Sequence, residues 1–152
     1  MSGTFESNHP YDLGKNYINR KWCIVPPAGK FAKISFGGFK SELTYDGLAI
    51  KIDGHTHLFS GDDNVPVSNY VSMVKPNPIK PGNHFKSQYP EQIVELSADF
   101  EYCGSSHIDF HWISDWRTSD WGYLINFEFV DCCDGSCKGG INASIDNDSI
   151  RW

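Results

Sequence analysis

The sequence predicts an all-β protein, an antiparallel β-sandwich, and three observations support this prediction. The 152 residues include 10 Phe, 7 Tyr and 5 Trp with 14 Gly and 8 Pro, a composition that favours strands and turns over helices. In residues 108–112 and 123–129, large apolar side chains recur at every second position, the period of a half-buried strand. Shorter alternating runs recur between Gly- and Pro-containing turns, which is typical of sandwiches.

The first half of the chain contains three expected strands. Residues 1–20 are polar and turn-rich, and residues 22–25 then form a short apolar run that two prolines end. Alternation over residues 30–36 predicts the second strand, which a Gly-Gly pair ends or bulges. Alternation over residues 48–52 predicts the third, closed by an Asp-Gly turn.

The second half begins with the least patterned part of the chain. Residues 55–92 contain five prolines, and only residues 70–74 look like a strand there. Residues 92–100 fit a strand or one helical turn, and we interpret them as a strand. The two alternating runs named above supply the last two strands, separated by an aromatic and acidic loop. Loops carried on a rigid sheet are where binding residues usually lie.

Length and charge limit the classes of function. A chain of this length is expected to form one domain, which we place at residues 1–131, followed by a Cys-containing tail at residues 132–152 that packs on it. The net charge of −6 and the scattered basic residues argue against a nucleic-acid or anionic-membrane partner. No stretch approaches the roughly 18 apolar residues of a membrane span, and no secretory signal pattern opens the chain.

The cysteine count is odd, so the cysteines cannot all pair within one chain. They are Cys23, Cys103, Cys132, Cys133 and Cys137. The favoured interpretation is a disulfide-tied C-terminal loop, with free buried thiols or a thiolate or metal cluster as alternatives, and the pairing stays open. Disulfides would indicate an oxidising, extracellular compartment.

Five short motifs of this sequence occur in the same order as in a known domain family. They are Gly3 to Tyr11, Trp22 to Gly29, Ile34 to Phe39, Glu42 with Tyr45 to Ile50, and Ser114-Asp115 before Gly122-Tyr123. In this order they resemble the CUB domain family, over a little under half of the chain. The resemblance implies a CUB-like, jelly-roll-type sandwich. Arg20 stands where the family has a cysteine whose N-terminal partner is also missing, so the resemblance is to a divergent member without the family disulfides.

The resemblance also implies a calcium site. Many CUB domains bind Ca²⁺ at one end of the sandwich, and the matching residues here are Glu42, Asp46 and Asp115. Calcium takes six to eight oxygen ligands, which carboxylates, backbone carbonyls and water can supply. The alternative is that Asp46 and Asp115 are turn residues that bond to their own backbone.

Trp116, Trp121 and Tyr123 surround the loop that carries Asp115. Exposed, they would form a platform for a sugar ring or a partner side chain; buried, they would cap the core. We expect one or two of the three to be exposed.

Two groups of histidines are candidates for a transition metal. His107, Asp109 and His111 share one face of a strand, opposite its core face. Because the ends of this run are far apart for one ion, a solvated outer face is the favoured interpretation. His55 and His57 are interpreted as a loop pair.

The sequence contains no catalytic motif such as a G-x-S-x-G elbow or H-E-x-x-H, so we expect no enzyme. The predicted function is an extracellular or secreted recognition module that binds a protein partner through its acidic, Ca²⁺-organised loop end. The resemblance implies that the metal orders the loops and that a basic partner side chain then docks. The alternatives are a carbohydrate-binding sandwich that uses the Trp and Tyr rings, and a structural subunit of a larger assembly.

Overall fold

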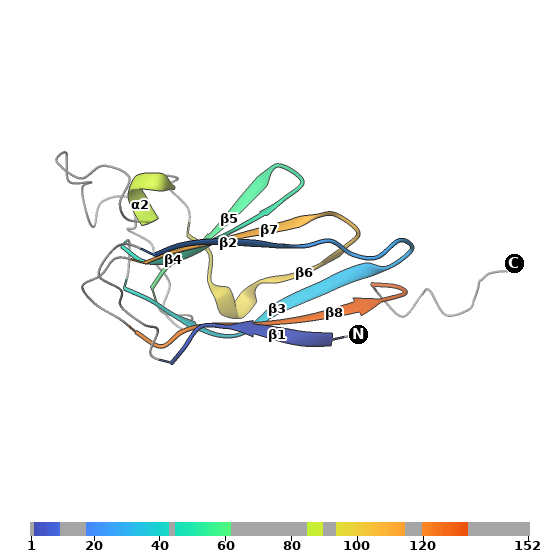
Figure 1. Cartoon of the computed structure of the whole chain (residues 1–152), viewed down its shortest axis with the longest axis horizontal. Helices are drawn as coiled ribbons and strands as arrows, with labels where there is room; N and C mark the ends of the chain where they lie inside the picture. Colours follow the sequence, from blue (N-terminus) through green and yellow to red (C-terminus); the bar gives the residue numbers. More distant parts are fainter. Residues whose placement is uncertain are drawn as a thin grey trace, which may run out of the picture.

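The computed structural model is a sandwich of two four-stranded antiparallel sheets (Figure 1). It describes residues 2–9, 18–42, 45–61, 85–89, 94–114 and 120–133. The first sheet has the order β1-β8-β3-β6, made of β1 (Ser2–Glu6), β8 (Gly122–Val130), β3 (Phe31–Lys40) and β6 (Glu101–Gly104). The second has the order β2-β7-β4-β5, made of β2 (Ile18–Ile24), β7 (Ile108–Ser114), β4 (Gly47–Ile52) and β5 (His55–Phe59). This arrangement confirms the predicted all-β sandwich.

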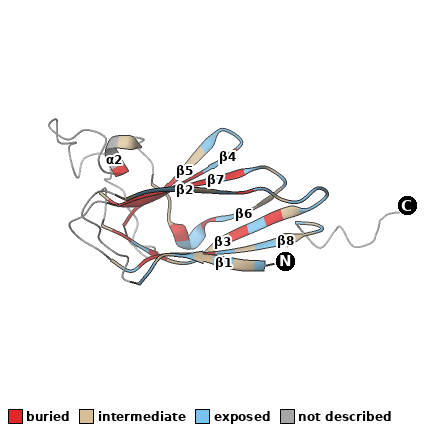
Figure 2. Ribbon diagram, viewed as in Figure 1, coloured by how far each residue is buried: buried red, intermediate tan, exposed pale blue. Residues whose placement is uncertain are grey.

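The core lies between the sheets and follows from the alternation in the sequence. Strand β7 directs Ile108, Phe110 and Trp112 inward, and β8 directs Tyr123 and Ile125 inward, and all five side chains are buried. In Figure 2, bands of buried and exposed residues alternate along β3, as expected of a strand with one face in the core. Each large apolar side chain that is fully buried contributes roughly 1.5–3 kcal/mol to stability.

A second, smaller core covers part of the outer face of the β2-β7-β4-β5 sheet. There Ala49, Leu58 and Ile113 pack under Phe85, which belongs to the single helical turn α2 (Phe85–Gln88). The ring of Phe85 lies directly over Gly47, where an added Cβ would come within 2.6 Å of it. Strand β4 is therefore buried on both faces over most of its length.

Several elements differ from the sequence prediction. The Gly-Gly pair does not end β3: the strand continues through it with a register shift between Phe36 and Gly38, which confirms the alternative of a bulge. The expected strand at residues 92–100 is wrong over the part described: the chain forms a 3₁₀ turn, η1 (Ser97–Asp99), because the N–H groups of Asp99 and Phe100 bond back to Leu96 and Ser97. Strands β1, β5 and β6 were not predicted, and residues 70–74 lie outside the described residues.

The cysteines divide into bonded and free. Cys103 on β6 forms a disulfide with Cys133, just beyond β8. Cys132 is also disulfide-bonded, whereas Cys23 on β2 is a free, exposed thiol. Cys137 lies outside the described residues. In the described part of the chain, no helix has the length and apolar character needed to cross a membrane.

Candidate functional site

Seven strands contribute ends to one end of the sandwich, which we call the loop end. Cross-strand pairs bring together the last residue of β3 and the first of β8, the first residue of β4 and the end of β7, and the first residue of β2 and the last of β7. Strands β1 and β5 also finish there. In Figure 1 the loop end lies away from the N-terminus.

Two of the three predicted calcium ligands, Glu42 and Asp46, lie in one turn at the loop end. The Asp46 N–H donates to the Glu42 carbonyl at 2.9 Å, so the two residues are separated by one closed turn of backbone. Asp46 is fully buried and the Oε1 atom of Glu42 is also shielded from water. Because charged groups are costly to bury, carboxylates in such a place need a cation or hydrogen-bond donors close by.

Two serines hold this turn against the neighbouring segments. The hydroxyls of Ser41 and Ser60 both donate to the Asp46 carbonyl, at 2.8 and 2.7 Å. Ser41 Oγ in turn accepts from the Gly61 N–H at 3.1 Å. The α2 turn adds a further hydrogen bond, which the Phe85 N–H donates to the Tyr45 carbonyl at 2.9 Å. The acidic turn is therefore fixed in place by buried hydrogen bonds.

The loop predicted to carry the third ligand leaves the sheet beside this turn. Gly47 on β4 pairs with Ile113 on β7, so the residues before Gly47 and after Ile113 emerge from adjacent strands. Ser114 ends β7 there, fully buried, and its hydroxyl has no hydrogen-bond partner among the described residues. Asp115, which follows it in sequence, lies outside the described residues.

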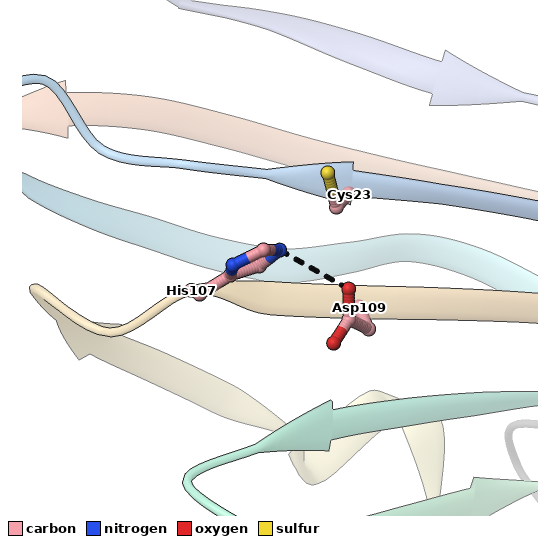
Figure 3. Close-up of side chains that lie close together, drawn as sticks. All are labelled: Cys23, His107 and Asp109. Atoms are coloured by element: carbon pink, nitrogen blue, oxygen red, sulfur yellow. Dashed lines mark ion pairs between the residues drawn. The ribbon is translucent and has the colours of Figure 1, made fainter.

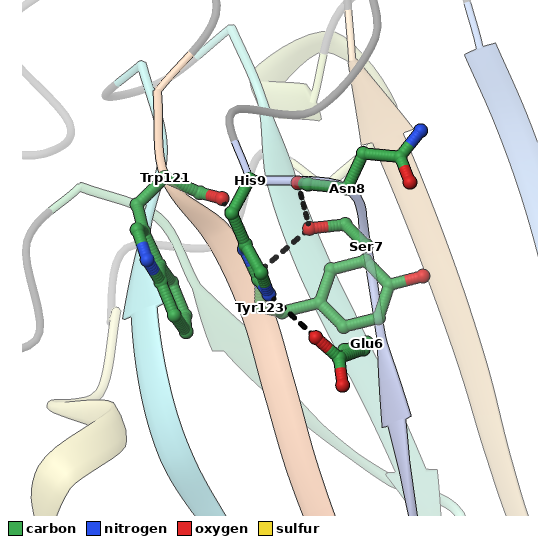
Figure 4. Close-up of polar contacts among 6 residues, drawn as sticks. All are labelled: Glu6, Ser7, Asn8, His9, Trp121 and Tyr123. Atoms are coloured by element: carbon green, nitrogen blue, oxygen red, sulfur yellow. Dashed lines mark hydrogen bonds and ion pairs between the residues drawn. The ribbon is translucent and has the colours of Figure 1, made fainter.

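The predicted aromatic platform is only partly available to a ligand. Trp121 is 38% exposed, but the His9 ring stacks on its indole with centroids 3.9 Å apart, as Figure 4 shows. His9 Nδ1 lies 2.7 Å from the Trp121 carbonyl oxygen, and Nε2 lies 2.9 Å from Glu6 Oε1. The segment after β1 therefore packs on Trp121, the residue that directly precedes β8. Trp116 lies outside the described residues.

Tyr123 lies in the core, which matches the core-capping alternative. It is 3% exposed and packs against Trp22 and Trp112. Burial raises the pKa of its hydroxyl above the ordinary value, while the charge and hydrogen bond of Arg20 lower it and so offset part of that rise. Arg20 therefore contacts the core at the position where the resemblance implies a missing cysteine.

The predicted trio of His107, Asp109 and His111 does not form one group. His107 and Asp109 are exposed, as expected of a solvated face, but His111 is buried on the same side of the sheet. Its Nδ1 bonds to the Tyr89 hydroxyl and its Nε2 to the Asn19 side chain. Burial lowers the pKa of His111, and the charge of Lys21 lowers it further.

Instead, two other groups of three donors come together among the described residues. One is Cys23, His107 and Asp109; the other is His55, His57 and Glu95. His55 and His57 belong to β5 rather than to a loop, and His57 Nδ1 lies 2.7 Å from Glu95 Oε2. Sequence reasoning missed both groups because each joins residues that are distant along the chain.

No protein-family model and no curated protein matches this sequence. Among solved structures, the chain is similar to the CUB1-EGF-CUB2 region of human MASP-1/3, with a TM-score of 0.54 and 17% identity, over 87% of this chain and 42% of that one. It is also similar to the full extracellular region of zebrafish Gpr126/Adgrg6, with a TM-score of 0.53 and 19% identity, over 85% of this chain and 14% of that one. The chain thus spans less than half of either structure. The likeness shows a CUB-like fold and so confirms the resemblance at that level.

Proposed function

We propose that this chain is a non-enzymatic extracellular recognition module whose loop end binds a protein partner in a Ca²⁺-dependent way. The observation that carries the proposal is the acidic turn at the end of a CUB-like sandwich: a backbone hydrogen bond joins Glu42 and Asp46, and Asp46 and the Oε1 atom of Glu42 are shielded from water. The Cys103–Cys133 disulfide supports an oxidising compartment, because such bonds persist mainly outside the cytosol.

The donor set of the loop end suits calcium. Glu42, Asp46 and Asp115 would hold the ion, since a hard cation prefers carboxylate and carbonyl oxygens. A bound cation would further offset the negative charge of the carboxylates in this shielded turn. Acidic oxygens left at the rim would then receive a Lys or Arg side chain of the partner, as charge-assisted hydrogen bonds allow.

A Ca²⁺ titration by calorimetry, combined with thermal melts in calcium and in chelator, tests the site. The variants are Asp46→Asn and Asp115→Ala, and Asp99→Asn, at an exposed position of η1, is the matched control. We expect saturable binding in wild type and in the control, and loss of binding in both site variants. At 100 times the dissociation constant, the ion should stabilise the fold by about 2.7 kcal/mol.

A Lys- and Arg-rich peptide should bind wild type with calcium and lose affinity in chelator. Calcium binding that Asp115→Ala leaves unchanged would rule out the proposed ligand set. Binding of a glycan that the basic peptide does not displace would instead favour the carbohydrate-binding alternative. That alternative has weak support here, because the His9 ring already covers one face of the Trp121 indole.

A further inference from the structure

Three chemically different metal ligands lie together at the opposite end of the β2-β7-β4-β5 sheet. They are Cys23 on β2, Asp109 on β7 and His107, which directly precedes β7 (Figure 3). One donor atom from each lies within 4.8 Å of the others. His107 Nε2 is 3.1 Å from Asp109 Oδ1.

The backbone holds these side chains on one surface. Cys23 and Asp109 are direct cross-strand partners, and directly opposed residues point to the same face of a sheet. His107 precedes Asp109 by two residues, which also places it on that face. All three are exposed, so small side-chain rotations can close the remaining distance without disturbing the core.

We propose that Cys23, His107 and Asp109 form a binding site for a transition metal of the Zn²⁺ class. Thiolate, imidazole and carboxylate bind Zn²⁺ at about 2.0–2.3 Å, which places tetrahedral ligands roughly 3.3–3.7 Å apart. The thiolate makes the site selective for Zn²⁺ over Ca²⁺ and Mg²⁺, which prefer oxygen. Three protein ligands leave the fourth position for water or for a side chain of a partner protein.

The state of the cysteines strengthens the argument. Cys103, Cys132 and Cys133 are disulfide-bonded, whereas Cys23 is free and exposed. An exposed free thiol in a disulfide-containing domain invites oxidation or pairing between molecules. Metal ligation gives this thiol a defined, protected state and releases its proton on binding.

The charges around the site limit its affinity. Lys51 on β4 is the cross-strand partner of Asp109 on its other side, and Lys21 and Lys51 line the same groove as Cys23 and Asp109. The positive charges of these ammonium groups repel a divalent cation and lower the affinity of the site. The ion therefore exchanges with solvent and is not a permanent structural metal. Replacing Lys51 with Gln should therefore tighten binding several-fold.

Cobalt(II) titration of the full chain without reductant tests the proposal, because a thiolate bound to Co²⁺ gives a charge-transfer band in the near ultraviolet. We expect one equivalent of Co²⁺ to produce this band and Zn²⁺ to displace it. Cys23→Ser should abolish the band, and His107→Ala and Asp109→Asn should weaken binding at least tenfold. His57→Ala is the matched control: it removes a ligand of the sulfur-free group His55, His57 and Glu95 and should leave the band unchanged.

The rate of Cys23 alkylation gives a second readout, which uses the wild-type protein and so does not depend on whether a variant folds. We expect saturating Zn²⁺ to slow alkylation of wild-type Cys23, and Ca²⁺ to have no effect. A missing thiolate band, an alkylation rate indifferent to Zn²⁺, or a Cys23 disulfide between chains on a non-reducing gel would each overturn the proposal. The result is independent of the calcium site, which contains no sulfur.

Discussion

His111 combines burial with a complete set of hydrogen bonds. The Tyr89 hydroxyl can donate to its Nδ1 and its Nε2–H can donate to Asn19, which describes a neutral imidazole. Burial lowers the pKa of His111, with Lys21 as the second cause. The groove also contains Lys51 and Asp109. Since the neighbouring cations outnumber the carboxylate, an imidazolium is disfavoured at this position.

Acidification should therefore destabilise the fold through His111. Because its folded pKa lies below the ordinary value, its contribution is complete above pH 6.5 and is lost as the pH falls through 6.5 towards the folded pKa. His111→Gln keeps a neutral donor and acceptor at every pH. The melting temperature of this variant should therefore fall less between pH 7.5 and pH 5 than that of the wild type. Parallel slopes for wild type and His111→Gln would contradict this assignment.

The α2 turn is too short to persist alone and depends on its contact with β4. Four residues make too few intrahelical hydrogen bonds to offset the cost of nucleation. Phe85 is fully buried over Gly47, and its N–H bonds to Tyr45 next to the acidic turn. The position of α2 and that of the proposed calcium ligands are therefore coupled.

Gly47→Ala should displace the Phe85 ring, because the new Cβ would lie within 2.6 Å of ring atoms. We expect a loss of about 1–3 kcal/mol of stability, as for other overpacked sites. Denaturant unfolding measures this loss, and calcium affinity should weaken with it. The smaller side chain in Phe85→Leu should relieve the clash, so the double variant should be more stable than the sum of the single effects. Strict additivity would mean that the two positions do not interact.

The strands that sequence patterns miss share a position in the fold. β1, β5 and β6 all lie at sheet edges, where one neighbour is absent and alternation is weak. Central strands such as β7 and β8 show the clearest alternation because both flanks and one face are packed. The candidate sites show a similar limit of sequence patterns. Glu42 and Asp46 are close in sequence and were predicted, whereas Ser60 reaches the acidic turn, and Glu95 reaches His55 and His57, only through folding.

At the scale of the whole molecule, the Cys103–Cys133 disulfide is a link that the sequence alone could not assign. The Cys103–Cys133 disulfide closes a segment with a sequence separation of 30, and this segment contains β7 of one sheet and the whole of β8 of the other. Strands β7 and β8 each occupy an interior place in their sheet. The disulfide thus restricts the conformational freedom that this segment, which contributes strands to both sheets, has in the unfolded chain.

Replacing both cysteines with serine should lower the free energy of unfolding by about 3–4 kcal/mol, the loop-closure entropy expected for a loop of this length. Substitution is preferable to reduction, because a reductant would also open the bond of Cys132. Equilibrium denaturation of wild type and of the double variant measures the difference, with Cys23→Ser as a control that changes a free thiol. A loss below about 1 kcal/mol would mean that the unfolded chain is already compact in this region. Residual structure there lowers the conformational entropy of the unfolded chain, so the disulfide has less of that entropy left to remove.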